Sequence, residues 1–242
     1  MNMHFRYLKG FDPWDIIIKN TDTNEEFALK NKYKSICPVC FYPNVSDKPK
    51  ECHSGIESLE SKISFITGHF YETDYEGNPL NWFGDILRKI SLQPFKHSHE
   101  ILKLILEEKI SNSDWQIEDI IYATMVPTTN LQMINLFSEI SQNINLTWIP
   151  YNQLFEKNTS TTFYKDRKEY VNNKYFLLEE SVDLLEQIEK DSSLLIFDDV
   201  FHQGYTLGRI IELLSKSNFI KFKLVTIART VPKSFLNIFQ FP

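Results

Sequence analysis

Residues 194–209 read Leu-Leu-Ile-Phe-Asp-Asp-Val-Phe-His-Gln-Gly-Tyr-Thr-Leu-Gly-Arg, and this stretch decides the fold of the chain. Its first four residues are apolar, which is typical of a fully buried strand. Two adjacent carboxylates, Asp198 and Asp199, follow this apolar run, and a short loop with Gly204 leads into a helical pattern of apolar residues. This order of strand, glycine-containing turn and helix start indicates an anion site, because free backbone N–H groups and the helix dipole both favour phosphate there.

The two acids add a second kind of chemistry to this anion site. Carboxylates at the end of a strand can accept hydrogen bonds from sugar hydroxyls or hold Mg²⁺. A phosphate site beside two acids therefore suits a sugar phosphate. The alternative is an ordinary buried strand with an acidic end, which occurs in many doubly wound folds.

The composition is that of an ordinary globular protein, with 42% hydrophobic and 24% charged residues in a chain of 242. The net charge of −6 argues against a broad nucleic-acid-binding surface, although a local basic patch is compatible with it. No run of about 18 apolar residues occurs, so we expect no membrane span. The first residues lack the pattern of a signal peptide and the three cysteines fit a reducing compartment, so we expect a cytoplasmic protein.

The cysteines indicate a metal site near the N-terminus. Cys37 and Cys40 form a C-x2-C pair, and Cys52 and His53 follow after a polar loop. A C-x2-C pair places two thiolates at one zinc knuckle, and a third cysteine with a nearby histidine completes a tetrahedral set. Because the last two residues are adjacent, His4 or His69 is an alternative fourth ligand. Three thiols without a metal are the other interpretation.

The chain divides into three expected regions: a zinc-knuckle-like region over residues 1–60, a hairpin with helices over 61–118, and an α/β domain over 119–242. Apolar strand patterns alternate with helical patterns from residue 119 onward. This alternation predicts a parallel sheet with helices on both faces. The polar segment 158–173, rich in threonine and basic residues, is predicted to be a mobile loop.

The central stretch resembles the phosphoribosyl-pyrophosphate (PRPP) motif of type I phosphoribosyltransferases, in which an apolar strand precedes two acids, an apolar pair and Thr-Thr-Gly-x-Thr. The sequence keeps both acids, Gly204 and Thr206, and has His202-Gln203 in place of the threonine pair. Over most of its length the chain resembles the ComF family of competence-associated phosphoribosyltransferases, which has a zinc knuckle, a tyrosine-rich hairpin and a transferase domain in this order. Residues 224–230, which end in Ala-Arg-Thr, are similar to the closing strand of that family.

The resemblance implies a type I phosphoribosyltransferase fold that binds Mg²⁺ together with PRPP or another 5′-phosphorylated nucleoside. In that fold Asp198 and Asp199 would hold the ribose hydroxyls, directly or through Mg²⁺, and Lys165 or Arg167 would contact the pyrophosphate. Thr128 lies in the first loop, which also contacts pyrophosphate in the resemblance. The 5′-phosphate would lie on a loop made of His202, Gln203, Gly204, Tyr205 and Thr206.

Two departures from the family pattern leave the activity open. His202-Gln203 replaces the threonine pair, and residues 128–132 carry no positive charge where the family has a basic stretch. One function compatible with the sequence is transfer of a phosphoribosyl group with release of pyrophosphate. The other is a catalytically weak or inactive protein that senses PRPP or a nucleotide, or that binds a protein partner in DNA uptake or defence. Nothing in the sequence identifies the acceptor substrate.

Overall fold

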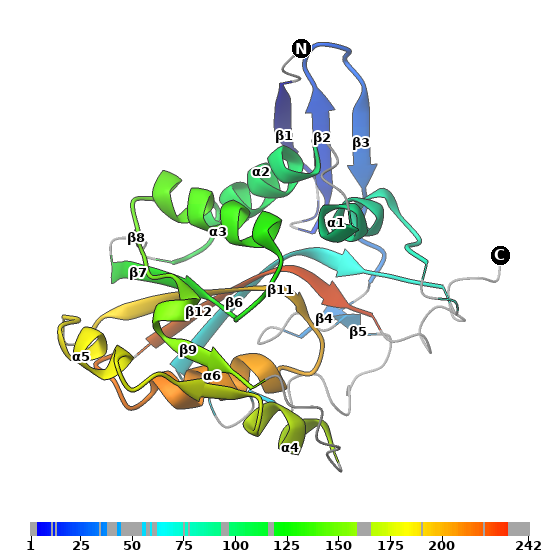
Figure 1. Ribbon diagram of the computed structural model, residues 1–242. Coiled ribbons are helices and arrows are strands. Elements are labelled where there is room, and N and C mark those ends of the chain that lie inside the picture. Colours follow the sequence, from blue (N-terminus) through cyan, green and yellow to red (C-terminus); the bar gives the residue numbers. More distant parts are fainter. Residues whose placement is uncertain are drawn as a thin grey trace.

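A five-stranded sheet lies between two groups of helices in the computed structural model of the chain (Figure 1). The structure describes residues 4–10, 12, 14–33, 35–37, 43–44, 55–56, 59, 62–74, 76, 78–92, 97–115, 119–158, 166–189, 191–219 and 221–231. Among the helices in these ranges, none has the length and apolar character needed to cross a membrane.

The sheet has the strand order β6-β12-β11-β7-β8, and every neighbouring pair is parallel. Its two long central strands, β11 (Ser193–Phe201) and β12 (Lys221–Thr230), are largely buried. This is the arrangement in which strands read as continuous apolar runs, because helices cover both faces. The prediction of a parallel sheet flanked by helices is confirmed. The remaining strands are β6 (Ile63–Tyr71), β7 (Ile120–Met125) and β8 (Thr147–Trp148).

Alternate side chains of β11 enter two separate cores, as expected from the two-residue period of a strand. Leu195 and Phe197 pack in the core beneath the helices α1 (Trp82–Leu92), α2 (Ser98–Ser111) and α3 (Leu131–Asn143). Leu194 and Ile196 pack in the opposite core, which contains the apolar residues of α5 (Ser181–Glu186) and α6 (Tyr205–Leu214). Figure 1 shows the first group of helices above the sheet and the second group below it.

The N-terminal part of the chain forms its own small sheet and also lends a strand to the main one. The strands β1 (Phe5–Lys9), β2 (Ile16–Asn20) and β3 (Glu26–Leu29) pair antiparallel and project from the body in Figure 1. A short pair, β4 (Ser35–Ile36) and β5 (Pro43–Asn44), follows. β6 belongs to the expected middle region of the chain, yet it forms the edge of the main sheet beside β12.

The strand order places a topological switch point between β7 and β11. From β7 the chain runs through α3 to the edge strand β8, and it then returns to β11 on the other side of β7. In open α/β sheets ligands bind outside the carboxyl ends of the strands at such a point. The carboxyl end of β11 is the beginning of the loop predicted to bind phosphate.

The segment 158–173, predicted to be a mobile loop, contains a short helix where the structure describes it. Helix α4 (Arg167–Asn172) begins at Asp166, whose side-chain Oδ1 accepts a hydrogen bond from the Glu169 N–H at 2.8 Å. This is a helix N-cap, which stabilises a helix start by about 1 kcal/mol. The flanking strands β9 (Phe155–Lys157) and β10 (Tyr175–Leu177) pair antiparallel, and η3 (Tyr151–Gln153) precedes them. Residues 159–165 lie outside the described part.

Candidate functional site

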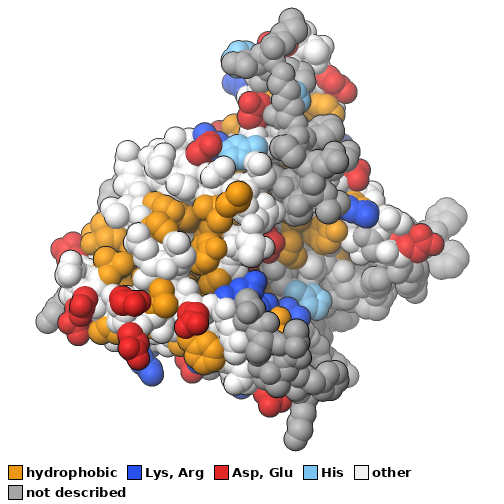
Figure 2. Space-filling view, viewed as in Figure 1, with side chains coloured by type: hydrophobic (Ala, Val, Ile, Leu, Met, Phe, Trp, Pro, Cys, Tyr) orange, Lys and Arg blue, Asp and Glu red, His pale blue; other side chains and the backbone are white. Residues whose placement is uncertain are grey.

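A pocket of about 60 Å³ lies where β11 ends and α6 begins. A cavity needs about 10–15 Å³ to hold one water molecule, so this volume is large enough for a phosphate group. In Figure 2 basic and histidine side chains gather around a hollow on the face shown. The pocket is lined by Arg167, Asp198, Val200, Phe201, His202, Gln203, Gly204, Tyr205, Thr206 and Leu207.

Most of the residues predicted to form the site therefore meet at one pocket. Asp198, Arg167 and the five residues from His202 to Thr206 all line it. The residues from 198 to 206 come together because a strand, a tight turn and a helix start are contiguous in sequence. Arg167 reaches the same pocket from α4, which contacts α6 in the fold.

Gly204 makes the tight turn that ends the loop. Its φ of +82° lies in the left-handed region, and it is the residue before the first turn of α6. An added Cβ would lie 2.8 Å from Cζ of Phe201 and 3.2 Å from Cγ2 of Ile56. Glycine is required here because other residues are strained at this φ and would also collide with Phe201. The first turn of α6 can then present its backbone N–H groups to the pocket.

Two groups distant in sequence hold the loop and were not predicted as site residues. The Gly55 N–H donates to the Gln203 carbonyl oxygen at 2.9 Å. The Arg229 guanidinium donates through Nη1 to the carbonyl oxygens of Phe201 and His202. The only sequence signals for these two residues were that Gly55 is one of seven glycines in the chain and that Arg229 lies in the Ala-Arg-Thr end of the closing strand.

The two acids have different surroundings, because successive residues of a strand point to opposite faces. Asp198 lines the pocket and is half-buried, whereas Asp199 is exposed and does not line it. Burial, and then the charge of Asp199, raise the pKa of Asp198 well above its ordinary value. Its Oδ1 accepts from the Asp199 N–H at 3.0 Å, which opposes this rise only in part.

These acids provide a suitable donor set for a divalent cation. Mg²⁺ is typically bound through one or two carboxylates, with waters and substrate phosphates completing its shell. Within the described residues no group of three or more histidine, cysteine or acidic side chains is arranged to hold a metal ion by itself. A cation beside Asp198 would therefore need oxygen atoms from a ligand, and it would relieve the cost of ionising this half-buried carboxyl.

A basic and aromatic cluster borders the pocket on the side of α4. The Arg167 guanidinium lies 5.7 Å from the centre of the Tyr170 ring. The Lys174 ammonium lies 4.7 Å from the Tyr170 ring and 5.2 Å from the buried Tyr175 ring. Arg209 of α6 donates from Nε to the Tyr175 carbonyl oxygen at 3.4 Å. Arg167 is the member of this cluster that lines the pocket.

Of the other residues predicted to bind phosphate, Thr128 is described by the structure and Lys165 is not. Thr128, just after β7, does not line it, and its Oγ1 accepts from the Asn130 N–H at 3.2 Å. Tyr151 donates its hydroxyl to the Thr128 carbonyl oxygen at 2.5 Å. Lys165 lies outside the described residues.

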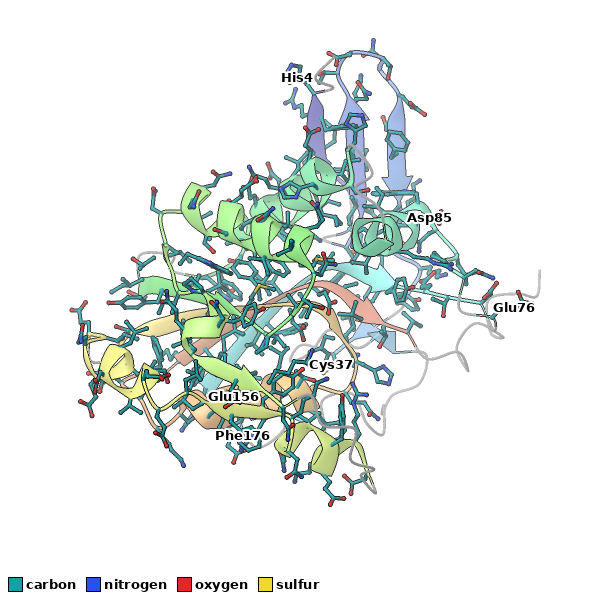
Figure 3. All side chains as sticks on the ribbon, viewed as in Figure 1. His4, Cys37, Glu76, Asp85, Glu156 and Phe176 are labelled. Carbon is teal, nitrogen blue, oxygen red and sulfur yellow. The ribbon has the colours of Figure 1, made fainter. Side chains whose placement is uncertain are left out.

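The predicted zinc site falls mostly outside the described residues, which include Cys37 but not Cys40, Cys52 or His53. Cys37 is partly buried against the core below the sheet. The alternative ligands are poorly placed: Figure 3 shows His4 at the far tip of the N-terminal sheet, well away from Cys37. His69 is buried, and its Nε2 lies 3.0 Å from the Trp14 carbonyl oxygen.

We predict that Asp198→Asn stabilises the ligand-free protein at neutral pH. The folded state raises the pKa of Asp198, so the stability contribution of this carboxyl is fully present below its unfolded pKa of about 3.9 and is lost as pH rises through the folded pKa. Thermal melts should show a higher Tm for the variant at pH 7–8, by about 2–4 °C for each ~1 kcal/mol. The difference should vanish near pH 4, and the exposed Asp85→Asn should show neither effect. Equal Tm values for variant and wild type at pH 8 would contradict the prediction.

Comparison with known proteins finds no matching family model and no matching curated protein. Solved structures that are similar include adenine phosphoribosyltransferase from Leishmania donovani, which is 11% identical with a TM-score of 0.43 over 81% of this chain and 86% of that chain. The enzyme of the same name from Leishmania tarentolae is 9% identical with a TM-score of 0.40 over 66% and 82%. A hypoxanthine phosphoribosyltransferase from Staphylococcus aureus is 14% identical with a TM-score of 0.35 over 55% and 74%. These values are too low to assign the chain to a family.

Proposed function

We propose that this chain is a phosphoribosyltransferase-like protein that binds PRPP, or another 5′-phosphorylated nucleoside, with Mg²⁺ in the pocket at the end of β11. One observation carries the proposal. A phosphate-sized pocket at the N-terminus of α6 is lined by a carboxyl group, Asp198, and by a guanidinium, Arg167. The helix start suits a phosphate, the acid suits sugar hydroxyls, and the guanidinium suits a second anionic group.

In this proposal each part of the pocket has its own role. Backbone N–H groups of residues 202–206, with the Thr206 hydroxyl, bind the 5′-phosphate. Asp198 and Asp199 accept hydrogen bonds from the ribose hydroxyls or share Mg²⁺ with them. When bound, Mg²⁺ would neutralise part of the charge on pyrophosphate. Arg167 stabilises the remaining negative charge as the bond to the ribose breaks, and Asp198 stabilises the positive charge that develops on the sugar.

Binding can be tested with two kinds of variant. Asp198→Asn combined with Asp199→Asn should weaken PRPP binding at least 10-fold, because the ribose and Mg²⁺ lose their carboxylates. Gly204→Val should abolish binding, because its side chain would strain the turn and collide with Phe201. Isothermal titration with PRPP and Mg²⁺ measures both effects. Asp85→Asn and Gly84→Ala on α1 are the controls, and both should bind like the wild type. Unchanged affinity in both site variants would exclude this pocket.

A second function, nucleotide sensing without efficient transfer, is favoured by the loop after β7. Residues 128–132 carry no basic side chain, and Asn130 caps α3 by accepting from the Gln132 N–H at 3.1 Å. Leu131 in the same loop is 70% exposed. This loop therefore supplies no charge to a leaving pyrophosphate, and Lys165 or Arg167 must supply it. This second function includes the binding of a protein partner in DNA uptake or defence.

We therefore predict measurable PRPP affinity with weak or absent transfer to common purine and pyrimidine bases. Arg167→Ala should remove nearly all transfer that exists, because one such charged contact contributes about 10²–10³ in rate. The neighbouring Lys168→Ala, which removes an exposed cation that does not line the pocket, should change the rate less than about 3-fold. Pyrophosphate release across a set of bases is the measurement. A turnover near ~10 s⁻¹, the usual enzyme median, would contradict the prediction.

We also propose that Cys37, Cys40 and Cys52, with His53 as the fourth ligand, bind one structural zinc. The support is the C-x2-C spacing with a later Cys-His pair. Elemental analysis of the purified protein should give one zinc per chain, and removing the metal should lower Tm because zinc binding stabilises the folded N-terminal part. Protein without zinc whose three thiols react freely in the native state would rule this site out.

A further inference from the structure

Three consecutive carbonyl groups, from the last residue of β11 and the first two residues of the loop 202–206, are held by residues that do not line the pocket. Arg229 donates from Nη1 to the Phe201 carbonyl oxygen at 3.0 Å and also to the His202 carbonyl oxygen. Gly55 donates its N–H to the Gln203 carbonyl oxygen at 2.9 Å. Neither Arg229 nor Gly55 is among the residues that line the pocket. All three carbonyl groups are therefore engaged by donors outside it.

The orientation of these carbonyls also fixes the orientation of the next N–H groups. In a planar trans peptide unit the C=O of one residue and the N–H of the next point in opposite directions. When the carbonyls of Phe201, His202 and Gln203 are held by Arg229 and Gly55, the N–H groups of residues 202, 203 and 204 point away from these donors. Successive N–H groups that point the same way form a concave anion site.

We propose that Arg229 and Gly55 are positioning residues, which orient the peptide units of residues 201–204 so that their N–H groups face a bound phosphate. This inference rests on the proposed function, because it specifies how the same pocket binds an anion. Arg229 acts from beneath the loop and Gly55 acts from the N-terminal part of the chain. The N-terminal part is therefore a component of the phosphate site.

The sheet determines where Arg229 lies. β12 pairs with β11 in a register that places Arg229 opposite Phe201, the last residue of β11. Arg229 is fully buried, and its guanidinium lies 4.7 Å from the centre of the Phe201 ring. The next residue, Thr230, donates its hydroxyl to the Phe201 carbonyl oxygen at 3.3 Å and lies 2.6 Å from Nδ1 of His202. The end of β12 thus holds the last residue of β11 and the first residue of the loop in place.

A guanidinium is well suited to this position. It is planar, remains charged at any ordinary pH, and offers several N–H donors from one rigid group. One terminal nitrogen of Arg229 reaches two carbonyls, while the face of the guanidinium packs on the Phe201 ring. Its buried positive charge also favours an anion in the adjacent pocket, because screening by water is weak there.

Gly55 can reach the loop only because it has no side chain. A Cβ on Gly55 would lie 2.3 Å from the Tyr205 backbone nitrogen and 2.4 Å from the Gly204 carbonyl carbon. A Cβ on Gly208 of α6 would lie 2.0 Å from the Gly55 carbonyl oxygen. The next residue, Ile56, is fully buried in the core that contains α6. Backbone therefore packs directly on backbone at the start of α6.

Backbone amide NMR during titration with inorganic phosphate tests the inference. In the wild type, phosphate should shift the amide signals of residues 202–204 more than those of the rest of the chain. Arg229→Met should weaken phosphate binding at least 10-fold, and Arg229→Lys should recover part of this loss because its ammonium can donate to the same carbonyl oxygens. Gly55→Ala should weaken binding at least 5-fold. The controls are Lys109→Met, which removes a partly buried cation next to Trp14, and Gly84→Ala on α1, whose added Cβ crowds Pro79. Both controls should bind phosphate within 2-fold of the wild type.

The outcomes separate this inference from the proposed function. Suppose that phosphate shifts the amide signals of residues 202–204 in a way that depends on Arg229, but that PRPP does not bind. This result would support the positioning role and overturn the proposed function. PRPP binding without shifts at these three amides would overturn the positioning role alone. Unchanged phosphate affinity in folded Arg229→Met and Gly55→Ala would overturn it as well. If Arg229→Met does not fold, Arg229→Lys, Gly55→Ala and the wild-type shifts still decide the question.

Discussion

The structure depends on the parallel pairing of β11 with β7 on one side and β12 on the other. β11 is buried on both faces. Its backbone pairs with β7 and β12, and its apolar side chains pack against the two helical layers. Its carboxyl end is consequently a fixed point in the molecule. The loop of residues 202–206, the turn at Gly204 and the start of α6 all take their positions from it. A site built on such a strand is held more rigidly than one built on a long loop.

The same strand brings a cost, because it carries Asp198 into a half-buried position. Desolvation and the neighbouring charge of Asp199 raise the pKa of this carboxyl, so it is expensive to ionise. Arg167 and the start of α6 bring positive potential to the same pocket. A carboxyl group and a guanidinium therefore line one small cavity.

The N-terminal part of the chain is connected to the site through backbone contacts. Gly55 lies against the start of α6, and β6 completes the edge of the main sheet beside β12. Gly55 and β6 precede residue 119, where the α/β domain was predicted to begin, yet they contact α6 and β12 of that domain. The backbone at Gly55 packs directly against the backbone of α6, which includes Gly208. This contact leaves no room for a side chain at either glycine.

The sequence by itself determined the elements whose information is local. The apolar run before Asp198, the turn at Gly204 and the helical pattern after it predicted a strand, a loop and a helix, and these positions meet at the pocket because they are contiguous. The parallel sheet followed from the alternation of strands and helices. The helix α4 was missed because its signal is a single cap at Asp166 within a polar segment. Only the tertiary structure decided that Gly55 and Arg229 hold the loop and that Thr128 lies outside the pocket. These contacts join residues far apart in sequence. They depend on sheet register and close packing, which leave no periodic pattern in the local sequence.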